Sequence, residues 1–254
     1  MIRTRTTGWE PAAKWYGGYM GSEGGAFQRE IVFPGAMKLL DPQTDGTYLD
    51  IACGQGAFAH LLAKKAGRVV GFDASTSLVK QAKERAQKNE MFLVGDAMHF
   101  ADLFEPASFD GSVCLLAIQN IKIIEPVLHD AALVLRRNSP LVIVMNHPCF
   151  RQPSQSGWGW DEQRKLQYRR VDRYLTSYHA PILTHPGADR TMKTDSFHRP
   201  LTEYVSALTK NGFVIDALEE WISNKKSDSG PRAKAENAAR EEIPMFLALR
   251  AWKI

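Results

Sequence analysis

Three aspartates lie in or at the ends of short apolar runs in the first half of the chain. Asp50 lies inside the run TYLDIAC, just before a turn that contains Gly54 and Gly56. Asp73 ends the run RVVGFD, and Asp96 ends the run MFLVGD. Carboxylates at the ends of neighbouring strands can accept hydrogen bonds from hydroxyl and amino groups, and they favour a cationic ligand over an anionic one.

The glycine turn fits the pattern GxGxx(G/A), which is compatible with a dinucleotide site. Its glycines let the backbone approach a ligand closely. A pyrophosphate would seek amide donors and a helix N-terminus there, and the Asp50 carboxylate would repel it. S-adenosyl-L-methionine carries an ammonium and a sulfonium and no phosphate. The sequence therefore favours this cofactor over NAD.

The other two aspartates suit the rest of an adenosyl ligand. Asp73 can accept both ribose hydroxyls, although NAD would use such a residue too. Asp96 can accept the adenine amino group while Ala97 and Met98 flank the ring. An aspartate at a strand end can also simply cap the next helix. Three of them on successive strands, together with the glycine turn, favour the ligand interpretation.

Strand-like and helix-like segments alternate between residues 47 and 146. Apolar runs predict strands at 47–53, 68–73, 91–96, 109–118 and 140–146, and the intervening patterns predict helices at 57–66, 75–88 and 125–137. This alternation predicts an α/β fold with a parallel sheet covered on both faces. A helix at 200–213 and strands at 213–222 and 243–254 follow, with a polar loop and some helix between the last two. These two strands predict an antiparallel hairpin at the sheet edge.

Composition and charge narrow the class of protein. The 254 residues carry a net charge of +4, too mild to indicate nucleic acid by itself. The three cysteines form no CxxC pair, so neither a metal site nor a disulfide framework is expected, and a reduced, cytoplasmic setting fits. The first residues lack the apolar core of a signal peptide, and no run is long enough to predict a membrane span.

These motifs resemble those of class I S-adenosylmethionine-dependent methyltransferases, closest to the small-molecule "type 11" branch that includes quinone-biosynthesis enzymes. DIACGQG is similar to the family's first motif, with Ala52 in place of its first glycine, and GFDAS and GDAM are similar to the ribose and adenine motifs. FDGSVCLLAIQNI is similar to the fourth motif, whose end lies beside the reacting methyl group. It lacks the (D/N)PP(Y/F) of enzymes that methylate DNA bases or protein glutamine.

The resemblance covers about residues 45–147 and 200–254. It implies a Rossmann-like, doubly wound seven-stranded sheet in the order 3-2-1-4-5-7-6 with the last strand antiparallel. We therefore expect an N-terminal helical cap at 1–45 and a methyltransferase domain at 46–254 that contains an insertion at 147–200. The expected cofactor-binding residues are Asp50, Ala52, Gly54, Gly56, Asp73, Ala74, Asp96, Ala97, Met98, Ala117 and Tyr16.

The insertion is rich in aromatic, histidine and arginine residues and poor in aliphatics. We expect it to form a lid over a small aromatic or heterocyclic methyl acceptor, because aromatic walls stack on such ligands and exclude water. The alternative is an aromatic mini-core or a homodimer contact. The arginines of QYRRVDR are expected on an exposed helical face, paired with nearby acids, and the alternative is that they recognise an acidic group of the substrate. The expected substrate-binding residues are Tyr19, Trp158, Trp160, Tyr168 and Arg199.

Methyl transfer needs a base only when the acceptor is a hydroxyl, an acidic carbon or a protonated amine. His147, which directly follows a predicted strand, is the first candidate, and His198 is the second. Gln119 could orient the acceptor or the methionine carboxylate. Three other functions stay open: an RNA methyltransferase, a non-catalytic binding subunit that keeps the fold, and an NAD(P) oxidoreductase.

Overall fold

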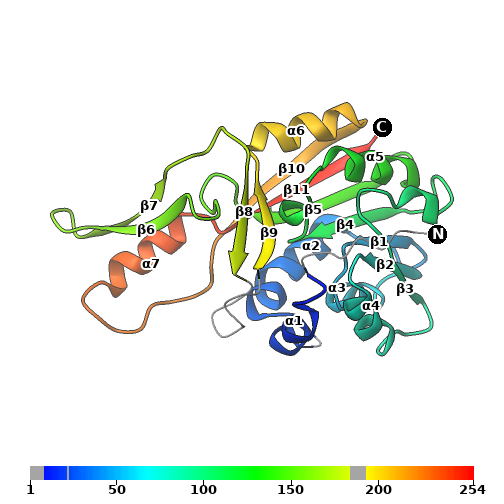
Figure 1. Cartoon of the computed structure of the whole chain (residues 1–254), viewed down its shortest axis with the longest axis horizontal. Coiled ribbons are helices and arrows are strands. Elements are labelled where there is room, and N and C mark those ends of the chain that lie inside the picture. The colour runs from blue at the N-terminus through cyan, green and yellow to red at the C-terminus, as the bar shows by residue number, and fades with distance from the viewer. Residues whose placement is uncertain (1–8, 22, 184–192) are drawn as a thin grey trace.

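The computed structural model describes residues 9–21, 23–183 and 193–254. Its centre is one seven-stranded sheet in the order β10-β11-β5-β4-β1-β2-β3 (Figure 1). The strands are β1 (Thr47–Ile51), β2 (Arg68–Asp73), β3 (Glu90–Val94), β4 (Gly111–Leu115), β5 (Pro140–Asn146), β10 (Phe213–Trp221) and β11 (Phe246–Lys253).

The sheet confirms the predicted fold and strand order. Strands β1 to β5 pair in parallel, and β11 runs antiparallel to both β5 and β10. Because β10 and β11 are the sixth and seventh strands of this sheet along the chain, the observed order is 3-2-1-4-5-7-6. The predicted late hairpin at the sheet edge is thus also confirmed.

Alternating side chains of the buried strands feed two cores, one on each face of the sheet. Along β5, Leu141 and Ile143 point into one core, and Val142 and Val144 point into the other. The first core is covered by α5 (Glu125–Val134) and α6 (Leu201–Lys210), and the second by α2 (Phe33–Leu40), α3 (Ala57–Leu62) and α4 (Thr76–Lys83).

Two local features interrupt the regular elements. The strand expected at 109–118 ends at Leu115 because Leu116 adopts a left-handed conformation with φ of 55°. The chain then forms the short helix η3 (Ile118–Asn120). Before α2, the π-helical turn η1 (Gln28–Val32) leads into Pro34, which lacks the N–H that a regular helix would use.

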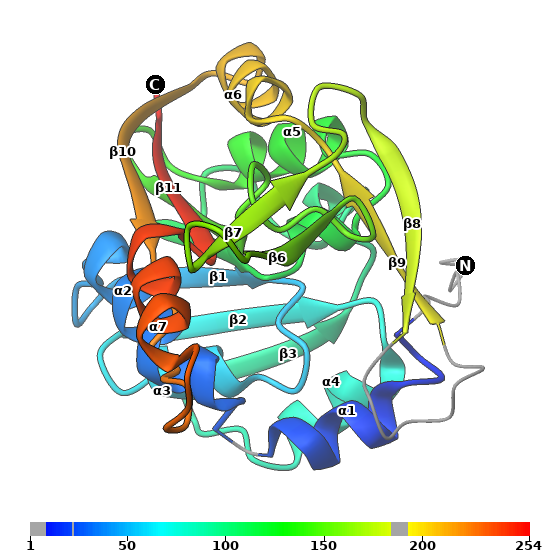
Figure 2. The ribbon, with the colours of Figure 1, turned by 90° about the vertical axis from the view of Figure 1, so that its left-hand side faces the viewer.

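The N-terminal segment lies on the side of the sheet that α2, α3 and α4 cover. Helix α1 (Ala13–Met20) packs against α4, as Figure 2 shows along the lower edge of the molecule. Within the described residues, no helix is long and apolar enough to cross a membrane.

The insertion forms two separate β-hairpins. The first pairs β6 (Ser156–Asp161) with β7 (Leu166–Val171), and the second pairs β8 (Tyr178–Leu183) with β9 (Lys193–His198). In Figure 1, β8 and β9 stand beside the sheet while β6 and β7 extend away from it together with α7 (Ala233–Glu242). The arginines of QYRRVDR that we expected on a helix therefore lie on and just after strand β7, although Arg170 does pair with Asp172.

Candidate active site

A cavity of about 510 Å³ opens at the carboxyl ends of the parallel strands. Strand ends, the N-terminal segment, η3 and the second hairpin all contribute to it. This is the edge of an open α/β sheet at which ligands bind. Its lining includes Trp9, Tyr16, Met20, Gln28, Ala52, Gly54, Asp73, Ala74, Asp96, Ala97, Met98, Leu116, Ala117, Gln119, Asn120, Lys122, Asn146, Ile182, Asp195 and Phe197.

The glycine turn shapes one wall of the cavity. Ala52 and Gly54 both have a φ of 57°, and Gly56 has a φ of 81° where it caps α3. A Cβ at Gly54 would meet nothing within 4 Å, so this backbone faces open space that a ligand can fill. A Cβ at Gly56 would press against His60 and Phe92 at 3.0 Å. Gly54 therefore leaves room for a ligand, and Gly56 allows α3 to pack closely.

Asp50 is buried in β1 and does not line the cavity, although we expected it to bind the cofactor. Burial raises the pKa of Asp50 to about 8, the nearby Asp73 carboxylate adds to the rise, and a hydrogen bond from the backbone of Ala59 opposes it. Its Oδ2 has no hydrogen-bond partner among the described residues. A buried carboxylate without a cation beside it is costly, so positive charge in the adjacent cavity would favour its ionised form.

Asp73 and Asp96 line the cavity at the ends of β2 and β3. The backbone N–H of Gly54 donates to Asp73 Oδ2 at 2.9 Å, and that of Ser75 donates to Oδ1 at 2.8 Å. Burial nevertheless raises the pKa of Asp73. Asp96 Oδ1 accepts a hydrogen bond from Met98 N at 2.9 Å. Both carboxylates thus hold the local backbone and still face the cavity.

The N-terminal segment closes one side of this cavity. Tyr16 lines it, makes a hydrogen bond with Gln28, and has its pKa raised by burial. Glu10 holds the segment to the start of α4, where its carboxylate accepts hydrogen bonds from Ser75 Oγ at 2.5 Å and Ser77 Oγ at 2.6 Å. Tyr19 lies in α1, but its side chain is outside the described part of the structure.

Gln119 brings an unused acceptor to the cavity. Its Nε2 donates to the backbone oxygen of Leu116 at 2.8 Å, which fixes the orientation of the amide because a carbonyl oxygen only accepts. The Oε1 atom is buried and has no partner among the described residues.

The two predicted histidine bases do not line the cavity. His147 is buried, its Nε2 lies 2.7 Å from Glu220 Oε1, and its Nδ1 accepts a hydrogen bond from Cys149 N. His198 Nε2 bonds the backbone oxygen of Tyr174 at 2.6 Å. Burial lowers the pKa of both imidazoles. Their placement favours structural roles, so we do not carry them into the site.

Three of the four aromatic residues expected to bind substrate lie on the first hairpin. Trp158, Trp160 and Tyr168 belong to β6 and β7 and are not among the residues that line the cavity. The Arg169 guanidinium lies 5.3 Å from the centre of the Trp158 ring, and that of Arg232 lies 4.5 Å from the centre of the Trp160 ring. These rings pack with arginines because the hairpin extends away from the sheet and toward α7.

The second hairpin supplies cavity residues that the sequence analysis missed. Ile182, Asp195 and Phe197 line the cavity from β8 and β9. Arg199 was expected to bind substrate, but it is buried behind this hairpin and donates from Nη2 to the backbone oxygens of Ile121 and Lys122. Alternation along KTDSFH could have grouped Asp195 with Phe197, had that stretch been recognised as a strand.

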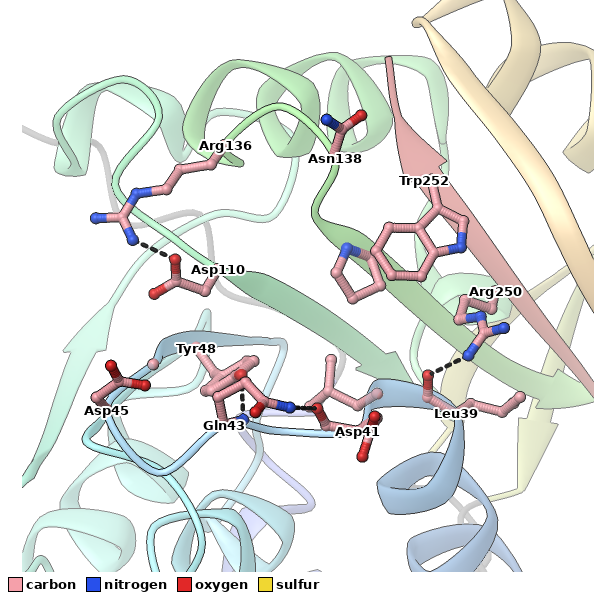
Figure 3. Close-up of a pocket in the computed structure, with 13 residues that line it drawn as sticks. Leu39, Asp41, Gln43, Asp45, Tyr48, Asp110, Arg136, Asn138, Arg250 and Trp252 are labelled. Carbon is pink, nitrogen blue, oxygen red and sulfur yellow. Dashed lines mark hydrogen bonds and ion pairs between the residues drawn. The ribbon is translucent and has the colours of Figure 1, made fainter.

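A second cavity of about 430 Å³ lies at the opposite, amino ends of the strands (Figure 3). Its arginines are engaged by the protein itself. Arg136 pairs with Asp110, and Arg250 forms a two-pronged pair with Asp216 at 2.7 and 2.9 Å. This cavity lacks the two strand-end aspartates, Asp73 and Asp96, and the open glycine backbone, so we place the site at the carboxyl ends.

Comparison with known proteins identifies the fold and the family of its central part. Residues 49–143 match the family model described as "Methyltransferase domain". The chain thus contains a methyltransferase domain, and its seven-stranded sheet has the fold of S-adenosylmethionine-dependent methyltransferases. A crystal structure of an S-adenosylmethionine-dependent methyltransferase from Mesorhizobium loti shares the fold of this domain with a TM-score of 0.71 and 23% identity, over 92% of this chain and 100% of that one.

Curated relatives of the methyltransferase domain match only in part. A 2-phytyl-1,4-naphtoquinone methyltransferase of Synechococcus elongatus is 34% identical over 119 residues, which are 42% of this chain and 50% of that protein. A 23S rRNA (uracil(1939)-C(5))-methyltransferase of Alcanivorax borkumensis is 43% identical over 58 residues, 23% of this chain and 13% of that protein. The chain thus spans at most about half the length of these relatives.

The residues of the cavity fit the cofactor of this family. The open backbone at Gly54 leaves the space that the ligand needs, and neither the buried Asp50 nor the half-buried Asp73 pairs with a lysine or arginine among the described residues. A ligand that combines a positively charged group with a nucleoside would fill the space at Gly54 and supply the positive charge that the two carboxylates favour. A solved neighbour from Streptomyces coelicolor, a geranyl diphosphate C-methyltransferase with a TM-score of 0.58, holds S-adenosyl-L-homocysteine in the same fold.

Proposed function

We propose that the protein transfers a methyl group from S-adenosyl-L-methionine to a small aromatic or heterocyclic acceptor. The observation that carries this proposal is the composition of one cavity. Strand-end carboxylates lie at its β1–β3 side, and aromatic side chains from the N-terminal segment and from β9 close it. Such a cavity suits a cationic nucleoside next to a flat, largely apolar acceptor.

The cofactor end rests on the residues after β1, β2 and β3. Gly54 gives its backbone room to approach the methionine part, Asp73 would accept the ribose hydroxyls, and Asp96 would accept the adenine amino group. Ala74, Ala97 and Met98 would flank the adenosine, with Ala52 and Ala117 on either side of the methionine part. When bound, the cofactor supplies a methyl group already activated by its sulfonium.

The chain's contribution to the reaction is alignment and exclusion of water. Tyr16 and Trp9 contact each other at a ring-centroid distance of 5.2 Å and line the cavity together, which places an aromatic wall on its N-terminal side. Phe197 provides a second aromatic surface from β9. The partial similarity to a naphthoquinone methyltransferase supports an acceptor of this flat kind.

An RNA acceptor is the second candidate, and the short matches to rRNA methyltransferases favour it. A phosphate backbone requires a row of cations. Lys122 is the only lysine or arginine among the described residues that line the cavity. The lining therefore supports a small molecule better than RNA. The chain could also act as a non-catalytic binding subunit, and the test below covers that outcome.

We also propose a cellular setting for the protein and a surface for homodimer contact. The three cysteines of the chain are free thiols, which supports a reducing, cytoplasmic setting. If the protein forms a homodimer, the exposed first hairpin is the surface that we propose for the contact.

The test is mass spectrometry of a low-mass metabolite extract and of total RNA, each incubated with the protein and methyl-labelled cofactor. We expect label in a low-mass product and none in RNA. Label in RNA alone would replace the small-molecule acceptor by an RNA. A protein that binds the cofactor and labels neither pool would be a non-catalytic binder.

A further inference from the structure

One carboxylate of the cavity has no place in the cofactor site described above. Of the described carboxylates that line the cavity, Asp73 and Asp96 lie at strand ends, whereas Asp195 comes from β9. Strand β9 packs against η3, which carries Gln119. Asp195 therefore belongs to the end of the cavity where the acceptor would lie.

The hairpin register brings His179 to Asp195. Phe197 is opposite His179 and Asp195 is opposite Pro181, so these residues share one face of the hairpin and His179 is diagonal to Asp195. The His179 Nε2 atom lies 2.6 Å from Asp195 Oδ1, and the His179 ring stacks on Phe197 at a centroid distance of 5.0 Å. One carboxylate oxygen is thus held by an imidazole that is itself held by stacking.

The other oxygen of the carboxylate is available. Asp195 Oδ2 makes no hydrogen bond within the part of the chain that the structure describes, and the side chain is about half exposed and lines the cavity. Gln119 lines the same cavity, and its Oε1 is a buried acceptor without a partner among those residues. A ligand at this end of the cavity would meet the free Asp195 oxygen best with a hydrogen-bond donor.

We propose that Asp195, oriented by His179, is the catalytic proton acceptor, and that the methylated atom of the substrate carries an O–H or N–H. This inference rests on the proposed methyl transfer. Asp195 takes the proton while the lone pair of the oxygen or nitrogen forms the bond to the methyl carbon. The carbon–sulfur bond breaks, its electron pair stays on sulfur, and the cofactor leaves as a neutral thioether.

His179 acts in this proposal as a positioning residue. An imidazole N–H that donates to Oδ1 leaves Oδ2 directed at the substrate and stabilises the charge of the carboxylate. Its loss would leave Asp195 free to rotate, which lowers kcat more than it weakens substrate binding. A glutamine can donate a similar hydrogen bond without titrating, so it would restore part of the lost rate.

The test compares variants of the two hairpins with the labelled-cofactor assay. First, the product formed by the wild-type protein is fragmented to locate the methyl group, and the acceptor is purified. The variants Asp195→Asn, His179→Ala and His179→Gln are then assayed for kcat and KM with that acceptor, and for cofactor affinity by calorimetry. Asp172→Asn is the matched control, because Asp172 pairs with Arg170 at 2.9 Å on the first hairpin, outside the cavity.

We expect a methyl group on oxygen or nitrogen. Loss of a positioned proton acceptor lowers kcat about 100-fold in Asp195→Asn with unchanged cofactor affinity. His179→Ala should lower kcat about 10-fold with little change in KM, and His179→Gln should recover part of it. Asp172→Asn should match the wild type.

Two results would overturn the inference while the proposed function stands: a methyl group on carbon, or a fully active Asp195→Asn. A wild-type protein that binds the cofactor and transfers no methyl group would remove the proposed function and this inference together.

Discussion

The two hairpins of the insertion come from one stretch of sequence and differ in what their side chains contact. On β8–β9, Asp195 and Phe197 line the cavity, and Arg199 ties the end of β9 to the loop after η3. On β6–β7, Trp158 and Trp160 stack with arginines, and β7 packs against α7. Aromatic content alone therefore does not identify the substrate side; contact with the strand ends does.

Removing one aromatic ring from each hairpin tests this difference between the hairpins most strongly. Phe197→Ala deletes a cavity wall and should lower kcat/KM about 30-fold, because stacking and apolar burial of the acceptor are both lost. Cofactor affinity should not change. Trp160→Ala should keep kcat/KM within about twofold and lower only the thermal midpoint. Steady-state kinetics would contradict the comparison if the two variants lost the same activity.

The anchoring arginines give a second contrast. Arg199 donates to the backbone oxygens of Ile121 and Lys122, and Arg169 donates to Phe150 O at 2.6 Å and Ser156 Oγ at 2.9 Å. Replacing either one by alanine should cost about 2 kcal/mol of unfolding free energy, since charged hydrogen bonds are lost.

Only the loss of the Arg199 anchor should affect turnover. We expect kcat/KM to fall about tenfold in Arg199→Ala. The substitution removes the hydrogen bonds that hold β9 to Ile121 and Lys122, which lie at the end of the cavity where the acceptor would bind. Urea unfolding and kinetics measured on the same preparations separate the two effects. Equal activity of the two alanine variants would show that the tie does not position the site.

The buried Asp50 and the exposed Asp172 give a third contrast, which is measured as the pH dependence of the unfolding free energy. Folding raises the pKa of Asp50 from 3.8 to about 8, so the folded state holds the proton more tightly than the unfolded state. This contribution to stability is fully present below about pH 4 and is lost as pH rises through about 8.

Between these pH values the unfolding free energy of the wild type should fall, relative to Asp50→Asn, by at most about 1.4 kcal/mol per pH unit. Asp172→Asn, an exposed change on the first hairpin, should follow the wild-type curve. Urea unfolding at several pH values tests this. Parallel curves for the wild type and Asp50→Asn would show that Asp50 is not the buried titrating group.

The smallest expected effect concerns the surface pair of the first hairpin. Arg170 and Asp172 are both largely exposed, and exposed pairs contribute less than about 1 kcal/mol. Thermal denaturation of Arg170→Ala should show almost no change in midpoint at moderate salt. A loss of several degrees would mean that this pair holds the hairpin more firmly than its exposure indicates.

The sheet was predictable because local patterns determine it. Apolar runs, glycines and strand-end aspartates predicted all seven strands. The motif that contains Ala52 also predicted which residues form the turn beside the cavity. The end of β4 was not predicted because Leu116 ends the strand in a left-handed conformation. An apolar residue in the sequence gives no sign of such a conformation.

The insertion was not predictable to the same degree. Phe197 and Trp160 are both aromatic residues in polar surroundings, and only the pairing of β8 with β9 and of β6 with β7 separates their roles. His147 directly follows a strand, as a catalytic histidine could, yet Glu220 from β10 engages its ring. Such contacts depend on residues distant in sequence, which spacing along the chain does not reveal.

The central claim is that strand-end carboxylates select a cationic adenosyl ligand in the cavity covered by β8–β9. Calorimetric titration of the protein with S-adenosyl-L-methionine and, separately, with NAD tests it most directly. We expect one site for S-adenosyl-L-methionine, no heat with NAD, and affinity for the former reduced at least about tenfold in Asp73→Asn, which loses a charged hydrogen-bond acceptor. Tight binding of NAD without binding of S-adenosyl-L-methionine would contradict the claim.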